Sequence, residues 1–297
     1  MDLNNIYALD KNLIAAAFDR AAREYEARAV LQFTVAERMI ERLDLFKIKP
    51  RLIVDVGSGS GHGARLLARY YKGSQVIALD LSTGMLMQAR RLAPRFRSPF
   101  RYVSGDAECL PIEGTCVDMI YSNLTLQWCN DLDRAFGEFR RVLKPSGLLL
   151  FSTFGPDTLK ELRASWATVD DKVHVHHFID MHDLGDALIR AGFSSPVMDV
   201  ENFTLTYRDL TSLMRDLKAL GASNVSLGRR QTLTGKNAFG KVAGAYEAYR
   251  RDQCLPATHE VVYGHAWAPE RHTRPQDGST VASFPISRIS RIKDRRY

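Results

Sequence analysis

The chain has 297 residues, of which 45% are hydrophobic and 25% are charged. That balance is typical of a globular protein and excludes collagen-like, low-complexity and wholly disordered chains. Lys and Arg together number 41 against 34 Asp and Glu, which gives a formal net charge of +7. Seven basic and two acidic residues fall in 271–297, so this tail carries +5 of the charge. We therefore expect a flexible basic tail and no nucleic-acid partner.

The sequence gives no sign of a membrane or of an oxidising compartment. No apolar run approaches the roughly 20 residues that cross a bilayer. The opening residues, MDLNNIYALDKNLIAAAF, match neither a signal peptide nor a transit peptide. The four cysteines, at positions 109, 116, 129 and 254, form no C-x-x-C pair, which indicates reduced thiols rather than a zinc or redox motif. We predict a cytoplasmic protein without a membrane partner.

Strands and helices are predicted to alternate after an N-terminal helical stretch. Apolar residues at helical spacing predict a helix over 12–44. From Arg51 onward, short apolar runs alternate with amphipathic stretches, which is the pattern of βαβ units in a parallel sheet covered on both faces. The predicted strands are Leu52–Val56, Gln75–Leu79, Phe100–Ser104, Val117–Ser122 and Leu148–Thr153, with helices near 62–71, 84–92 and 131–142.

The second half of the chain continues this pattern more loosely. Helices are predicted near 157–167, 181–191, 209–221 and 236–251, and strands at Val197–Thr206 and His259–Trp267. The predicted fold class is α/β, with a doubly wound, mostly parallel sheet of seven strands. We expect an N-terminal helical cap (1–48), an α/β core (49–207), a basic helical lid (208–257), the last core strand (258–269) and the tail (270–297).

The glycine-rich segment from Asp55 to Gly61 lies between a predicted strand and a predicted helix. Glycines there let the backbone approach a ligand, and the N–H groups of the helix start point outward. Gly59 to Ala64 also satisfies the loose G-x-G-x-x-A fingerprint of dinucleotide-binding proteins. However, an anionic pyrophosphate would not favour the carboxylate of Asp55. S-adenosylmethionine carries an ammonium and a sulfonium, and therefore suits an acidic neighbour.

Two further carboxylates follow the next strands. Asp80 ends the second strand, where it can accept hydrogen bonds from both ribose hydroxyls, and Asp106 follows the third, where it can accept from an adenine amino group. Together with the glycine loop, these residues resemble the class I S-adenosylmethionine-dependent methyltransferases. The resemblance implies S-adenosylmethionine as cofactor, bound by Asp55, Gly57, Ser58, Gly59, Gly61, Asp80, Leu81, Met85, Asp106, Ala107 and Asn123.

Five other segments carry a more specific resemblance: Phe18–Tyr25 with Gln32, Ser122–Cys129, Phe151–Leu162, Leu217–Asn224 and Leu255–Thr258. They are similar to segments of the malonyl-acyl carrier protein O-methyltransferases, which start pimeloyl synthesis for biotin. The resemblance implies methyl transfer to the free carboxylate of a malonyl group on the phosphopantetheine of acyl carrier protein, or on coenzyme A, and implies no metal. A carboxylate is already a nucleophile, so the reaction needs alignment and exclusion of water rather than a general base.

The same resemblance suggests where substrate lies. Tyr25, Gln127 and Trp128 are the candidate catalytic residues, and Arg20, Arg229 and Arg230 are candidates for holding malonate or the carrier. Residues 208–251 hold nine Lys and Arg against three Asp and Glu, which gives this segment a charge of +6. Because acyl carrier proteins are acidic, we expect the lid to face the carrier.

Three other functions remain open at this point. The motifs Phe-Gly-x-Asp-Thr-Leu and Leu-Pro-Ala-Thr also resemble a respiratory complex I assembly factor that modifies an arginine of its client. The cofactor motifs alone also allow a methyltransferase acting on a quinone precursor, or a non-catalytic binding protein. A metal site built from His174, His176, His177 and His182 is not expected, since one loop and a helix start do not supply ligands from several directions.

Overall fold

The computed structural model describes residues 6–94, 100–229 and 234–270 of the chain. The strands are β1 (Leu52–Val56), β2 (Gln75–Asp80), β3 (Phe100–Ser104), β4 (Val117–Asn123), β5 (Leu143–Phe154), β6 (Ser194–Tyr207) and β7 (Leu255–Trp267). They form one seven-stranded sheet in the order β3-β2-β1-β4-β5-β7-β6. Only β7 runs against its neighbours, pairing antiparallel with both β5 and β6. The predicted doubly wound, mostly parallel sheet of seven strands is thus confirmed.

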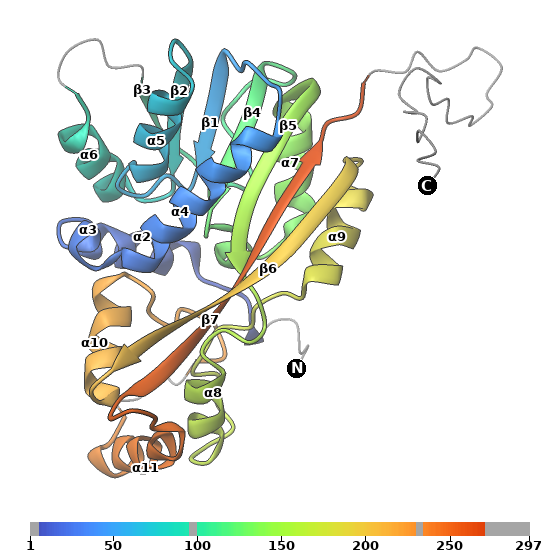
Figure 1. Ribbon diagram of the computed structural model, residues 1–297. Helices are drawn as coiled ribbons and strands as arrows, with labels where there is room; N and C mark the ends of the chain where they lie inside the picture. The colour runs from blue at the N-terminus through green and yellow to red at the C-terminus, as the bar shows by residue number, and fades with distance from the viewer. Residues whose placement is uncertain (1–5, 95–99, 230–233, 271–297) are drawn as a thin grey trace, which may run out of the picture.

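Helices cover both faces of this sheet (Figure 1). The covering helices are α4 (Val30–Arg42), α5 (His62–Tyr70), α6 (Thr83–Leu92), α7 (Leu132–Val142) and α9 (Met181–Arg190). Val54 and Val56 of β1 point into the hydrophobic cluster under α7 and α9, whereas Ile53 points into the cluster under α4, α5 and α6. This double burial explains why the core strands read as continuous apolar runs rather than as alternating ones.

The N-terminal segment does not form the single helix predicted over 12–44. It divides into α2 (Lys11–Ala21), α3 (Tyr25–Arg28) and α4, followed by a short 3-10 turn, η1 (Leu43–Leu45). Ala29 leaves the helical conformation with φ −77° and ψ 39°, and its side chain is fully buried at that bend. The apolar spacing continues across the break because each segment buries one face, so periodicity alone does not reveal the bend. The bend directs α3 toward the carboxyl ends of the strands.

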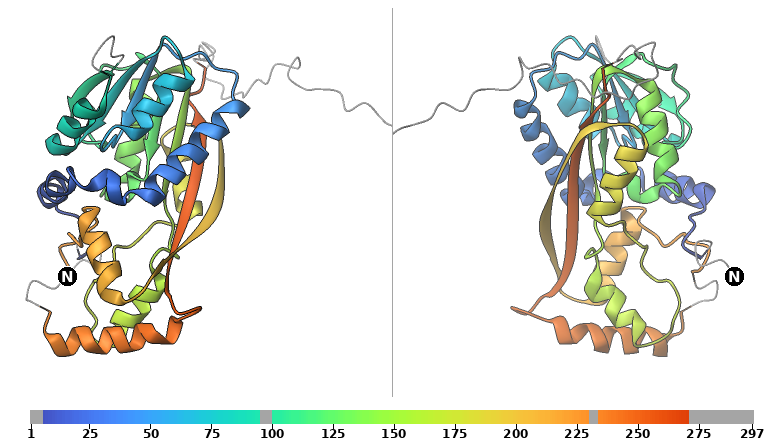
Figure 2. Two further views of the ribbon diagram at one scale, coloured as in Figure 1. Left: turned by 60° about the vertical axis from the view of Figure 1, so that its left-hand side comes forward. Right: turned by 90° about the vertical axis from the view of Figure 1, so that its right-hand side faces the viewer.

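A second helical group gathers at the far end of β6 and β7, away from the other strands (Figures 1 and 2). It contains α8 (Lys160–Ala167), α10 (Leu210–Ala219) and α11 (Lys236–Tyr246), which ends in the 3-10 turn η3 (Glu247–Tyr249). Leu162, Leu213 and Tyr246 join these helices in one hydrophobic cluster. Pairing of Tyr207 with Leu255 means that β7 begins at Leu255 rather than at His259 or residue 258. The division into cap, core and lid remains our proposal, with α8 added to the lid.

Two expectations concern parts of the chain beyond this fold. Residues 271–297, which make up nearly all of the predicted basic tail, lie outside the described residues. Within the described ranges, no helix has both the length and the apolar character needed to cross a bilayer.

Candidate active site

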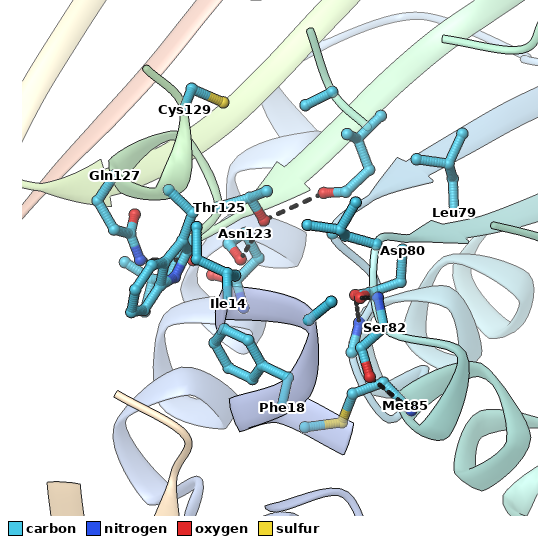
Figure 3. Close-up of a pocket in the computed structure, with 18 of the residues that line it drawn as sticks. Ile14, Phe18, Leu79, Asp80, Ser82, Met85, Asn123, Thr125, Gln127 and Cys129 are labelled. Atoms are coloured by element: carbon cyan, nitrogen blue, oxygen red, sulfur yellow. Dashed lines mark hydrogen bonds between the residues drawn. The ribbon is translucent and has the colours of Figure 1, made fainter. Parts of the chain in front are cut away.

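A pocket of about 120 Å³ lies at the carboxyl ends of β1, β2 and β4, and Ile14 and Phe18 of α2 point into it (Figure 3). Tyr25 of α3 also lines it. This is the edge of an open parallel sheet at which ligands bind. The structure brings most of the predicted residues together there. Those that line the pocket are Tyr25, Gly57, Gly59, Asp80, Leu81, Met85, Asp106, Ala107, Asn123, Gln127 and Trp128.

The glycine loop takes its shape from residues with positive φ. Gly57, Gly59 and Gly61 have φ angles of 71°, 53° and 78°, in the left-handed region that favours glycine. The N–H groups of Gly57 and Ser58 donate to the carbonyl of Leu79 at 2.8 and 3.0 Å, which joins the loop to β2. A Cβ on Gly59 would meet only the ring of Tyr25, at 3.9 Å, so the loop leaves open space toward the pocket.

The other predicted loop residues lie just outside this pocket. Asp55 and Ser58 line an adjoining cavity of about 30 Å³, together with His62. Gly61 lines neither space. It begins α5, and a Cβ there would lie 2.9 Å from the Cβ of Ala89 on α6, so Gly61 permits close packing of two helices.

Two buried carboxylates dominate the electrostatics of the site. Asp80 accepts from the N–H groups of Gly59 and Ser82 at 2.8 Å each, yet burial raises its pKa to about 6. Asp55 is 1% exposed, and no hydrogen-bond partner of its Oδ2 lies among the described residues. Burial, with the nearby charge of Asp80, raises the pKa of Asp55 to about 8. Both groups would be stabilised as anions by a cation in the pocket.

Asp106 has a cationic partner that the sequence did not indicate. Lys11 of α2 places its Nζ 3.0 Å from Asp106 Oδ1 and 3.3 Å from Glu108 Oε2. Glu108 also donates its N–H to Asp106. Lys11 therefore ties the N-terminal helix to the loop after β3, at the side of the pocket formed by Asp106 and Ala107.

The N-terminal helix is fastened at a second point on the pocket rim. Asp19 of α2 accepts from the hydroxyl of Ser82 at 2.6 Å and from the N–H of Gly84 at 2.7 Å. Ser82 in turn caps α6 by accepting from the N–H of Met85. Ser82, which lines the pocket at the N-cap of α6, is thus joined to the helix that covers the pocket. Figure 3 shows the contact of Ser82 with Met85.

A second cavity, of about 370 Å³, adjoins the first and is largely apolar. Gln127 and Trp128 line both spaces, and so do Phe154, Leu220 and Ala222. The amide of Gln127 is fixed at both ends, since its Nε2 donates to the carbonyl of Leu124 at 2.6 Å and its Oε1 accepts from Thr153. The two cavities therefore meet at a rigid boundary.

An aromatic row runs from the first pocket, lined by Phe18 and Tyr25, through Trp128 to His176 in the second cavity. The ring of Phe18 lies 6.5 Å from that of Tyr25 and 5.2 Å from that of Trp128, and His176 lies 5.2 Å beyond Trp128. Burial raises the pKa of Tyr25 well above its ordinary value, helped by the charge of Asp80, so its phenol stays protonated. Burial lowers the pKa of His176, so this imidazole stays neutral. The row excludes water and offers neutral polar groups.

The candidate substrate arginines are not gathered at this boundary. Arg20 lines a surface groove between α2 and α10. Arg229 donates from its Nη1 to the carbonyl of Ser226 at 3.0 Å and lines neither cavity. Arg230 lies outside the described residues. The basic side chains that do line the second cavity are Arg28 and Lys218.

The four histidines considered for a metal make separate contacts. His174 stacks on Trp166 at 3.7 Å, His176 packs on Trp128, His177 lies against Tyr7 and His182 contacts Asp180. In the part of the chain that the structure describes, no group of three or more His, Cys, Asp or Glu side chains is arranged to hold a metal ion.

The residues present fit the predicted cofactor. Two buried polar atoms, Asp55 Oδ2 and Ser58 Oγ, lack partners among the described residues and face the small cavity beside the glycine loop. An ammonium group would satisfy both of them. Asp80 and Asp106 follow neighbouring strands, where carboxylates can accept from ribose hydroxyls and an adenine amino group. This donor and acceptor set matches S-adenosylmethionine, with its cationic amino-acid end and neutral nucleoside end.

Comparisons with known proteins agree with this geometry. A family model described as a methyltransferase domain matches residues 54–151. In the solved structures, the YcgJ protein from Bacillus subtilis superposes with a TM-score of 0.59 at 15% identity, covering 80% of this chain and 99% of that one, which shows the fold alone.

Relatives closer in sequence give the family. A malonyl-acyl carrier protein O-methyltransferase of Methylovorus sp. (strain MP688) is 52% identical over 283 residues, covering 94% of this chain and 96% of the relative. One from Nitrosospira multiformis is 49% identical over 286 residues, covering 91% and 93%. These matches run through the cap, the core and the lid, well beyond the glycine loop that many cofactor-binding proteins share. The chain belongs to the malonyl-acyl carrier protein O-methyltransferase family.

Proposed function

We propose that this protein transfers a methyl group from S-adenosylmethionine to the free carboxylate of a malonyl group carried by acyl carrier protein. The observation that carries the proposal is the meeting of two cavities at Gln127 and Trp128. One cavity is lined by carboxylates and a glycine loop, and the other is wide and apolar. Relatives that share about half of the sequence bear the name of this reaction.

The cofactor is S-adenosylmethionine, which supplies, when bound, an electrophilic methyl group on a sulfonium. We assign its amino-acid end to the glycine loop with Asp55 and Ser58. Its ribose is assigned to Asp80, and its adenine to Asp106 and Ala107. Leu81, Met85 and Asn123 complete the walls of the pocket.

The chain's own residues meet the demands of methyl transfer to a carboxylate. No side chain has to remove a proton, because a malonyl carboxylate is already ionised near neutral pH. Tyr25, whose phenol is a neutral donor, lines the cofactor pocket, and Trp128, whose indole N–H is another, lines both cavities. A carboxylate held by neutral donors keeps more of its charge for attack than one paired with a guanidinium. Tyr25, Gln127 and Trp128 therefore act by positioning the nucleophile.

Exclusion of water gives the second contribution. Phe18, Trp128 and Phe154 line the cofactor pocket, Trp128 and Phe154 also line the second cavity, and Ile14 and Phe18 bring α2 against this apolar lining. A dry site strengthens the remaining electrostatic interactions, and alignment of the reacting groups is worth on the order of 7–11 kcal/mol.

The second cavity suits a malonyl thioester and the end of the phosphopantetheine arm. Its walls include Leu159, Leu162, Met214 and Leu217, which offer apolar surface to the apolar parts of such an arm. Arg28 and Lys218 are the Lys and Arg side chains on its lining, and Arg28 is exposed and 3.8 Å from Asp216. They attract the anionic substrate without standing at the reacting atoms.

Intact-mass measurement of the carrier tests this proposal. Holo acyl carrier protein loaded with malonyl is incubated with the enzyme and S-adenosylmethionine, beside unloaded and acetyl-loaded carrier. We expect a gain of one methyl group on the malonyl form alone. A methyl gain on all three forms would place the reaction on the carrier protein itself. No gain on any form, with S-adenosylhomocysteine still bound by calorimetry, would point to a protein side chain or a quinone precursor as substrate.

A further inference from the structure

A basic groove lies on the outer surface between α2 and α10, beside the second cavity. Its lining includes three cations, Arg20 from α2 and Arg215 and Lys218 from α10, and one carboxylate, Glu24. Ala17, Ala21 and Ala219 form its floor, so small side chains leave room between the charged ones. The formal charge of the groove is therefore +2, on a face made by the cap and the lid together.

The three cations of this groove form no ion pair with a carboxylate of the described residues. Across residues 6–94, 100–229 and 234–270, no carboxylate lies within ion-pair distance of Arg20, Arg215 or Lys218. Other basic residues of the lid are engaged: Arg208 contacts Asp209 at 3.3 Å, and Arg250 contacts Glu247 at 2.6 Å. A cluster of unpaired like charges repels itself, and an anion bound in the groove would relieve that repulsion.

One loop borders the groove and both cavities. Lys218 and Ser223 line the groove and the second cavity, while Leu220 and Ala222 line the second cavity and the cofactor pocket. Gly221, at the centre, has φ 75°, and a Cβ there would lie 3.0 Å from the ring of Phe18 on α2. The loop is therefore pressed against the cap, and a continuous lining runs from the groove to Trp128.

We propose that this α2–α10 groove anchors the phosphodiester of the carrier's 4′-phosphopantetheine, and with it the acidic carrier. The inference rests on the proposed function. It places the anionic end of the arm at Arg20, Arg215 and Lys218, the apolar arm in the second cavity and the malonyl carboxylate at the boundary. Guanidinium groups suit this task because their planar fork matches two phosphate oxygens at once.

Small thioesters separate recognition of the phosphate from recognition of the carrier. The substrates are malonyl-pantetheine, malonyl-4′-phosphopantetheine and malonyl-holo carrier. We expect the unmodified enzyme to prefer the phosphorylated small thioester in kcat/KM by about tenfold or more. In the double variant Arg215→Glu and Lys218→Glu, this preference is expected to disappear, and the KM for the carrier is expected to rise by at least about tenfold.

A matched control comes from the same lid. Lys236→Glu with Lys241→Glu makes the same change of charge on α11, where both lysines are exposed and line none of the three spaces. This control variant is expected to keep the preference for the phosphorylated thioester. Binding of unloaded holo carrier, followed by fluorescence anisotropy with S-adenosylhomocysteine present, gives a readout independent of turnover. The affinity of the groove variant for the holo carrier should be lower than that of the unmodified enzyme, and it should depend much less on salt concentration.

The outcomes separate the two proposals. If the unmodified enzyme does not methylate malonyl carrier, the proposed function fails. If it does, but the groove variant keeps the preference for the phosphorylated thioester, the phosphate lies elsewhere and the assignment of the groove is overturned. An equal loss in the groove and control variants also overturns it, because general charge would then account for the effect. Unchanged binding of S-adenosylhomocysteine shows that the variants are folded.

Discussion

The carboxyl group of Asp55 is the most strongly perturbed acid of the cofactor site. Burial, followed by repulsion from Asp80, raises its pKa from 3.8 to about 8, while the N–H of Ala64 and the charge of Arg65 oppose the shift. The folded protein without cofactor therefore binds a proton at Asp55 that the unfolded chain has already lost above about pH 4. The contribution of Asp55 to stability then falls as the pH rises from about 4 toward 8, because this carboxyl binds a proton in the folded state that it has lost in the unfolded state.

The substitution Asp55→Asn removes this dependence while keeping the shape of the side chain. From the two pKa values, Asp55 lowers the free energy of unfolding by at most about 4 kcal/mol between about pH 5 and pH 8. The side-chain amide of the variant does not titrate in this range. The free energy of unfolding of the variant, relative to that of the unmodified protein, is therefore expected to rise by that amount between about pH 5 and pH 8. Its affinity for S-adenosylhomocysteine should nevertheless drop by about tenfold, since the ammonium loses its anionic partner.

Urea unfolding of the cofactor-free protein at several pH values measures the difference. Asp118→Asn serves as the control, because Asp118 accepts from Lys144 and from backbone N–H groups that lower its pKa. Asp118 is ionised in both the folded and the unfolded states between about pH 5 and pH 8. The difference in free energy of unfolding between Asp118→Asn and the unmodified protein should therefore stay constant over this range. If the difference in free energy of unfolding for Asp55→Asn is also independent of pH, Asp55 is not a protonated, neutral acid in the cofactor-free protein, and this account is refuted.

Other variants test the cap, the rim and the lid. Tyr25→Phe removes a neutral donor and should lower kcat by about tenfold with unchanged affinity for S-adenosylhomocysteine; an unchanged kcat would remove Tyr25 from the positioning role. Gly84→Ala places a Cβ 2.8 Å from Asp19 Oδ1, so it should loosen α2 and weaken cofactor binding in calorimetry; normal binding would show that the Asp19 contact is dispensable. Leu162→Ala deletes a side chain that is 2% exposed, and should cost about 2–5 kcal/mol of unfolding free energy if the lid unfolds together with the core.

The cofactor half of the site could be predicted because its signals are local. The run from Asp55 to Gly61 joins a strand to a helix within a few residues, and Asp80 follows directly from the next strand. Parallel strands bring their carboxyl ends to one edge, so local motifs become neighbours in space. The fold class followed from the same alternation of apolar strands and amphipathic helices.

The residues that the sequence did not indicate come from contacts between distant segments. Lys11 reaches Asp106 across 95 positions of the chain, and nothing in its own neighbourhood marks it as part of the site. His176 lines the second cavity only because its loop returns to Trp128. The bend at Ala29 was hidden by continuous helical spacing. Long-range packing decides each of these features, and a single sequence does not specify such packing.

The proposed methylation of the malonyl carboxylate is tested most directly by identifying the chemical bond that holds the transferred methyl group. S-adenosylmethionine labelled in its methyl group is incubated with the enzyme and malonyl-loaded carrier, and the carrier is then treated with mild alkali. A carboxyl methyl ester releases the label as methanol, and this release is the result we predict. Label that stays on the carrier after alkali, or that appears equally on unloaded carrier, would contradict methylation of the malonyl carboxylate.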